Sequence, residues 1–115
     1  MKHEEETLHI LWSTGEQQSA EKMVLMYGGN ALRRGWWKQV TIIIWGASVS
    51  LIAGSPGIQE RIRALAAEGV TFTACRACAE QLGQDSLLES LGVEVVYWGE
   101  RLTELLAGGR PLLTV

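Results

Sequence analysis

The sequence predicts an α/β fold, a three-layer αβα sandwich with a mostly parallel sheet of about five strands. Short apolar segments rich in β-branched residues alternate with segments whose apolar residues recur every three or four positions. The first pattern is typical of strands and the second of amphipathic helices, so their alternation indicates βαβ units. Residues 40–45 are apolar almost throughout, which indicates a strand buried on both faces of a parallel sheet.

The first strand and the first helix follow from an apolar segment and the stripe behind it. Residues 8–13 are mostly apolar and run into turn-forming residues, which predicts a strand. A helix over about 19–34 is predicted next, with the apolar stripe Ala20, Met23, Val24, Tyr27, Ala31 and Leu32. Gly28 and Gly29 weaken this helix and are expected to kink or shorten it, and Gly35 ends it.

The middle of the chain contains the strongest strand and the best-marked helix. Strand 40–45 is followed by a turn and a short apolar stretch to residue 52. Ser55 and Pro56 predict a helix start, because serine caps a first turn and proline suits the first helical position. This helix extends to Gly69, and its predicted buried face consists of Ile58, Ile62, Leu65 and Ala66.

The remaining elements are shorter. Residues 70–74 predict a third strand, which leads the chain directly to Cys75. Asp85 or Ser86 is expected to cap the second of two short helices that follow. The elements predicted after Cys75 are helices at about 76–82 and from that cap to 91, a strand at 93–97, a helix at 102–107 and a last strand at 111–115.

Length and composition restrict the function classes. The 115 residues suit one domain, 1–115, in which the polar residues 1–6 are expected to form a frayed tail. The net charge of -3 argues against a nucleic-acid-binding surface. No apolar stretch typical of a secretory signal opens the chain, and residues 40–45 are too short to cross a bilayer. We therefore expect a cytoplasmic protein with neither a membrane nor a nucleic-acid partner.

The two cysteines, Cys75 and Cys78, are the strongest candidates for chemistry. In a reducing compartment such a close pair indicates metal, redox or sulfur chemistry rather than a structural disulfide. Cys75 is expected at the carboxyl edge of the sheet, where ligands gather, and at a helix N-terminus that favours a thiolate. Arg76 would add positive charge. The alternative is that both cysteines are small buried apolar residues.

Two other uses of the pair fit the sequence less well. A structural zinc site needs four ligands, of which the two cysteines supply two. The only histidines of the sequence are His3, in the tail, and His9, in a strand. A thioredoxin-like motif would place tryptophan before the first cysteine and Gly-Pro between the two, and neither is present. Metal held between subunits by Cys75 and Cys78 pairs stays a weaker option, and no resident metal is predicted.

Other residues at the carboxyl edge are expected to line the site. Parallel strands bring their following loops to one edge of the sheet. The residues predicted to surround Cys75 there are Ser13, Trp45, Gly46, Arg76 and Trp98, with Trp12 as a further possible wall. Trp36 and Trp37 cannot easily both be buried, so one is expected to anchor a subunit interface. No glycine-rich loop has the spacing that holds a nucleotide phosphate, so no cofactor is predicted.

Several segments in a fixed order carry a family resemblance. They are Arg34-Gly35-Trp36-Trp37 ahead of Val40–Trp45-Gly46, Gly69-Val70 ahead of Ala74-Cys75-Arg76-Ala77-Cys78-Ala79, and Leu91-Gly92-Val93-Glu94-Val95 ahead of Gly99-Glu100-Arg101-Leu102-Thr103. With these segments the chain resembles, over nearly its whole length, the DsrE/DsrF-like proteins of bacterial and archaeal sulfur metabolism. No single segment is decisive, and the order and spacing of all of them carry the resemblance.

The resemblance implies a fold, an assembly and a reactive residue. DsrE/DsrF-like proteins have a flavodoxin-like parallel sheet and assemble as trimers or hexamers, so a homotrimer or homohexamer is implied here. Some members carry sulfane sulfur as a persulfide on a cysteine after the third or fourth strand, a position that Cys75 matches. Cys78 matches a second cysteine that only some members have. Many members have no established activity.

These observations lead to two functional hypotheses. In the first, the protein is a sulfur carrier or sulfurtransferase that holds sulfane sulfur on Cys75 and passes it to a partner thiol. Its partners would be sulfur donor and acceptor proteins or small thiols, and Cys78 would resolve the persulfide. In the second, the protein is a non-enzymatic oligomeric module that binds a small ligand or a partner protein at the same edge.

Overall fold

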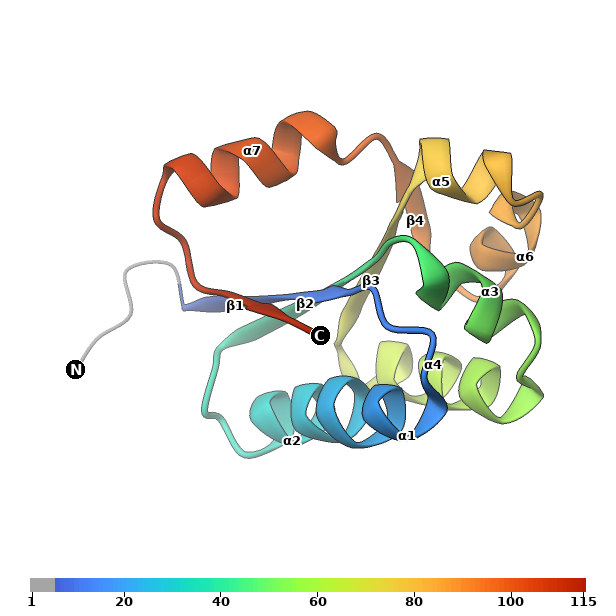
Figure 1. Ribbon diagram of the computed structural model, residues 1–115. Helices are drawn as coiled ribbons and strands as arrows, with labels where there is room; N and C mark the ends of the chain where they lie inside the picture. Colours follow the sequence, from blue (N-terminus) through green and yellow to red (C-terminus); the bar gives the residue numbers. More distant parts are fainter. Residues whose placement is uncertain (1–5) are drawn as a thin grey trace.

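A computed structural model describes residues 6–115 as one five-stranded sheet with helices on both faces, which confirms the predicted α/β sandwich (Figure 1). All four strand pairings are parallel, and the strand order is β4-β3-β2-β1-β5. The strands are β1 (Thr7–Trp12), β2 (Gln39–Ile44), β3 (Thr71–Cys75), β4 (Glu94–Val96) and β5 (Leu112–Thr114). The tail predicted over residues 1–6 lies outside the described residues except for Glu6.

The helices divide between the two faces and one end of the sheet. They are α1 (Gln17–Ser19), the π-helix η1 (Ala20–Met26), α2 (Tyr27–Arg33), α3 (Ala47–Ala53), α4 (Pro56–Glu68), α5 (Arg76–Gln81), α6 (Asp85–Ser90) and α7 (Gly99–Ala107). Figure 1 shows α1, α2 and α4 below the sheet, α7 above it, and α3, α5 and α6 grouped at one end. None of the helices within residues 6–115 is long and apolar enough to cross a membrane.

The last crossover reverses the direction in which strands are added to the sheet. From β1 to β4 each strand is added on the same side of its predecessor, and then α7 carries the chain back across the sheet to β5. Because crossovers between parallel strands are right-handed, a reversed step puts its helix on the opposite face. The connections that leave β3 and β4 therefore diverge to opposite faces. The strand order itself reverses between β1 and β5, which is the topological switch point of the sheet, whereas Cys75 lies at the carboxyl end of β3, two strands from β1.

Alternation along the strands divides the apolar side chains into two clusters. In β2, Ile42 and Ile44 belong to the main core, beneath the sheet, whereas Ile43 belongs to a second cluster with Cys75 and Trp98. Neighbouring strand residues point to opposite faces, so Ile43 and Cys75 lie on the face that α7 covers. We call Ile43, Cys75 and Trp98 the Cys75 cluster.

The helix predicted over 19–34 differs from the prediction because its centre is a π-helix. A π-helix has more residues per turn than an α-helix, so the buried face shifts along the sequence. Met23, predicted to be buried, is 48% exposed, and Leu25, outside the predicted stripe, is fully buried. The helix does not stop at Gly28 and Gly29. Both glycines are buried against neighbouring side chains, and this close approach is their role.

Helix boundaries are confirmed where the capping residue is distinctive. Ser55 Oγ accepts the Ile58 N–H at 3.3 Å, and Gly69 ends α4 with a φ of +113°. The cap predicted at Asp85 or Ser86 is wrong, because α6 is capped by Gln84 without a side-chain hydrogen bond. The apolar stretch to residue 52, for which no helix was predicted, forms α3.

The carboxylate of Glu16 caps α1 and predicts a pH-dependent stability. It accepts hydrogen bonds from the Ser19 hydroxyl and from the N–H groups of Ser19 and Gln18, which lower its pKa below the ordinary 4.5. A lowered folded-state pKa stabilises the fold above the unfolded-state value, and this stabilisation is lost as the pH falls through the folded-state value. Glu16→Gln should lower the thermal midpoint of unfolding at pH 7. At pH 3 the difference in midpoint between the variant and the wild type should be smaller. Equal differences at both pH values would contradict the cap.

Gly29 predicts a cost for any added side chain. A Cβ at Gly29 would lie 2.8 Å from Leu65 Cδ2, whereas a Cβ at Gly57, in α4, would meet nothing within 4 Å. Gly29→Val should lower the free energy of unfolding by about 1–3 kcal/mol through overpacking. Gly57→Ala, the matched control, should raise it by roughly 0.5–1 kcal/mol. Urea unfolding measures both, and a Gly29→Val protein as stable as the wild type would show that Leu65 yields without cost.

Candidate functional site

Cys75 lies at the carboxyl end of β3 and is buried. It is the last residue of the strand and the N-cap of α5, and it is a free thiol with 5% of its surface exposed. Its neighbours in the Cys75 cluster are Ile43 and Trp98. Half-buried side chains packed against the cluster are Leu11, Trp45, Cys78, Val96, Leu102, Leu105 and Leu112. The reactive position predicted from the sequence therefore lies at the carboxyl edge of the sheet, beneath α7.

Cys78 is the third residue of α5 and makes a specific backbone contact. It is a free, half-buried thiol, and its Sγ accepts the Gly46 N–H at an N···Sγ distance of 3.2 Å. Gly46 follows β2 with φ +72° and ψ -135°, a conformation that glycine adopts far more readily than other residues. The turn after β2 therefore aims an amide at the second cysteine, which cysteine spacing could not reveal.

Trp98 is held in place by a short hydrogen-bonded chain. Its indole N–H donates to Thr73 Oγ1 at 2.7 Å, and Thr73 Oγ1 donates to the Glu94 carbonyl at 2.9 Å. The Arg101 guanidinium lies 5.6 Å from the centroid of the indole ring. Trp98 was predicted to line the site, and Thr73 and Arg101 were not. The only sequence signal for Thr73 is a threonine two residues before Cys75, on the same face of β3.

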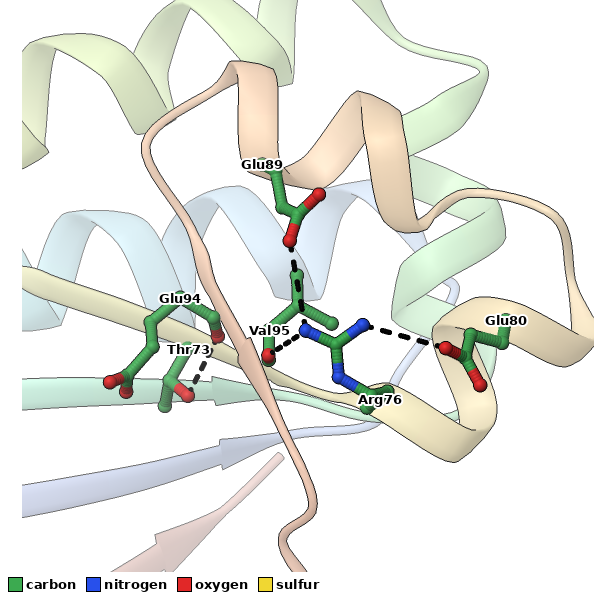
Figure 2. A network of polar contacts seen from close by, with 6 residues as sticks. All are labelled: Thr73, Arg76, Glu80, Glu89, Glu94 and Val95. Carbon is green, nitrogen blue, oxygen red and sulfur yellow. Dashed lines mark hydrogen bonds and ion pairs between the residues drawn. The ribbon is translucent and has the colours of Figure 1, made fainter.

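The Arg76 guanidinium contacts one backbone carbonyl and two carboxylates (Figure 2). Its Nη2 donates to the Val95 carbonyl at 2.6 Å and lies 3.7 Å from Glu89 Oε2, and its Nη1 lies 3.4 Å from Glu80 Oε2. The guanidinium thereby joins the first turn of α5 to β4 and α6. Two carboxylates partly neutralise the charge that was predicted to act on Cys75. The sequence analysis did not identify Glu80 or Glu89.

The other predicted residues lie nearer β1 and β2. Trp45 is half-buried against the Cys75 cluster, and its backbone N–H donates to the Trp12 backbone carbonyl at 3.1 Å. The Trp12 side chain is in the main core, on the other face, and does not join Trp45 and Trp98. Ser13 is exposed, and its N–H and Oγ both donate to the Val115 carbonyl. Ser13 is thus tied to the chain end after β5, and its carbonyl oxygen would lie 4.0 Å from a Cβ placed on Gly46.

Metal ligands do not assemble around the cysteines in the described part of the chain. Within residues 6–115 no group of three or more histidine, cysteine, aspartate or glutamate side chains is placed to hold a metal ion. What the arrangement offers instead is two thiols on the first turn of one helix. Sulfur atoms so placed can exchange with disulfides, polysulfides and persulfides.

Two solved structures are similar to this chain. A conserved protein of unknown function, BT1422 from Bacteroides thetaiotaomicron, is 40% identical, with 96% of each chain covered and a TM-score of 0.93. The ychN protein from E. coli is 17% identical, with 95% of this chain and 99% of that chain covered and a TM-score of 0.67. The second likeness shows the fold alone. No protein-family model matches the sequence, and no curated protein matches it.

The contacts of Arg76 predict a structural role that can be measured. Arg76→Ala should lower the free energy of unfolding by about 1–3 kcal/mol, because the Val95 carbonyl loses a charged donor. Arg63→Ala is the matched control, because Arg63 is exposed and makes one ion pair, at 3.6 Å to Glu60. Its removal should change stability by less than about 0.5 kcal/mol. Equal effects of the two substitutions in urea unfolding would refute the structural role of Arg76.

Proposed function

We propose a sulfur-carrier function for this chain, which belongs to the same family as BT1422 of Bacteroides thetaiotaomicron. The observation that carries the proposal is the position of Cys75 at the end of β3, on the carboxyl edge of the parallel sheet and at the start of α5. Reactive groups of α/β sheets gather at such a point. A second thiol on the same helical turn adds support, because paired thiols serve sulfur exchange.

The proposed reaction is a transfer of one sulfur atom between thiolates. The Cys75 thiolate attacks the outer sulfur of a donor persulfide or polysulfide, and a bond forms between Cys75 Sγ and that sulfur. The donor's sulfur–sulfur bond breaks, and its electron pair leaves on the donor thiolate or on the shortened polysulfide. The reverse step, with an acceptor thiolate, releases Cys75. No net oxidation occurs, and no cofactor is required.

The finer family assignment is part of this proposal. The resemblance to DsrE/DsrF-like proteins is supported by the parallel sheet and by Cys75 after the third strand. On this assignment the partners are donor and acceptor proteins or small thiols, and the assembly is a homotrimer or homohexamer. Trp36, 52% exposed, is the tryptophan available for a subunit contact, because Trp37 packs against the main core.

Mass spectrometry of the intact protein tests the proposed function. The reduced wild type is incubated with inorganic polysulfide, desalted and weighed. We expect a gain of one sulfur atom in Cys78→Ser and in the wild type weighed immediately after loading, and no gain in Cys75→Ser, because the persulfide forms on Cys75. A sulfur gain that survives Cys75→Ser would assign the carrier role to a different residue. Circular dichroism shows whether each variant keeps the wild-type fold.

The burial of Cys75 favours one alternative function. A thiol with 5% exposure, at an edge where Tyr97 follows β4 and is 65% exposed, also suits a module that binds a ligand or a partner protein at this edge without using the thiol. For such a module the folded protein would gain no sulfur from polysulfide, although the urea-unfolded chain would react. The same mass measurement, made with and without urea, therefore separates the two functions.

A further inference from the structure

The hydrogen bond between Gly46 and Cys78 distinguishes this cysteine from a passive core residue. The donor belongs to the turn after β2 and the acceptor to α5, 32 residues later, so the contact depends on the tertiary fold. The turn that bears the donor is itself hydrogen-bonded, because the Gly46 carbonyl accepts the Val49 N–H at 3.1 Å. In the same turn Ser48 Oγ accepts the Trp45 N–H at 3.1 Å. Negative charge that develops on Cys78 Sγ therefore meets a fixed N–H donor.

The places of the two cysteines on α5 put both thiols on one helical turn. Cys75 is the N-cap and Cys78 is the third helical residue. Cβ atoms three residues apart on a helix are about 5–6 Å apart. A disulfide needs a Cβ–Cβ distance of about 3.5–4.5 Å, so a small adjustment of the first turn suffices. Cys78 also packs against the Cys75 cluster.

We propose that Cys78 is the resolving thiol of this site and that the Gly46 amide is its positioning group, an inference that rests on the proposed sulfur-carrier function. The Cys78 thiolate attacks Sγ of the Cys75 persulfide. A bond forms between the two cysteine sulfurs, and the bond from Cys75 Sγ to the sulfane sulfur breaks. The leaving sulfur keeps its proton and takes the bonding electrons, so it departs as HS⁻.

Electrons balance within the site. The two cysteine sulfurs are oxidised to a disulfide while the sulfane sulfur is reduced to sulfide, so no external oxidant or reductant enters this step. The substrate class is therefore a carrier-bound sulfane sulfur, and the product is sulfide. A small thiol returns the disulfide to two thiols by exchange. With no acceptor thiol present, the site releases its sulfur instead of retaining it.

Sulfide release in a single turnover tests the resolving role. Wild type and Cys78→Ser are loaded with inorganic polysulfide, desalted and kept without added thiol. The wild type should release about one equivalent of sulfide and then weigh two hydrogens less than the reduced protein, because one disulfide forms per persulfide. Cys78→Ser should keep its added sulfur. If both proteins load sulfur and lose it at the same rate, the resolving role is wrong and the carrier function stands.

The positioning role of Gly46 needs a control for backbone strain. Compared per loaded persulfide, Gly46→Ala should release sulfide about tenfold more slowly than the wild type. Alanine does not readily hold φ +72° and ψ -135°, so the turn then moves its amide away from Cys78 Sγ. Gly35→Ala is the matched control, since Gly35 has the same φ of +72° and lies after α2. Equal slowing by both substitutions would overturn the positioning role.

A disulfide assay separates the failure of this inference from the failure of the carrier function. Oxidation of the reduced protein with diamide uses no sulfur donor. It should remove two hydrogens from the folded wild type and none from Cys78→Ser. A wild type that forms this disulfide but never gains sulfur from polysulfide would refute the carrier function and the resolving step with it. A wild type that gains sulfur but forms no disulfide would refute the resolving step alone.

Discussion

The right-handed path of crossovers between parallel strands determines which face of the sheet each connecting helix covers. The first two crossovers, through α2 and α4, cover one face of the sheet, and the third, through α5 and α6, lies at one end. The fourth, through α7, covers the other face (Figure 1). The divergence of chain direction after β3 and β4 follows from this rule. Cys75 ends β3 and Trp98 follows β4, so the two residues meet where the chain separates. The candidate site thus depends on topology before it depends on any single contact.

Prediction from sequence succeeded where one residue type has one structural meaning. Ser55, Pro56 and Gly69 each suit one position of a helix end, and α4 begins and ends as they indicate. It failed in η1, because the period of a π-helix is set by packing against the sheet and not by a distinctive residue. The place of Cys75 at the end of the third strand was predictable. The Gly46 contact was not, because it joins segments that only the fold brings together.

Polar contacts around the thiols hold parts of the site in place. Arg76 joins the first turn of α5 to β4 and α6, so the helix that bears Cys78 has a fixed start (Figure 2). The Thr73 hydroxyl fixes the indole of Trp98 beside Cys75. Neither residue bears a reactive group. Their shared effect is to hold the surroundings of the two cysteines in one arrangement, as a functional site requires.

The cover over Cys75 is attached by few buried side chains. None of the 9 residues of α7 is fully buried, and Leu102 and Leu105 provide its half-buried contacts with the Cys75 cluster. Segments with little buried apolar surface open locally at a lower free energy than the core does. Detachment of α7 would uncover the thiol while the main core stays folded. The fraction of molecules in which Cys75 is accessible is then set by the local opening equilibrium of α7. Substitutions on this amphipathic helix can change that equilibrium without changing the global stability.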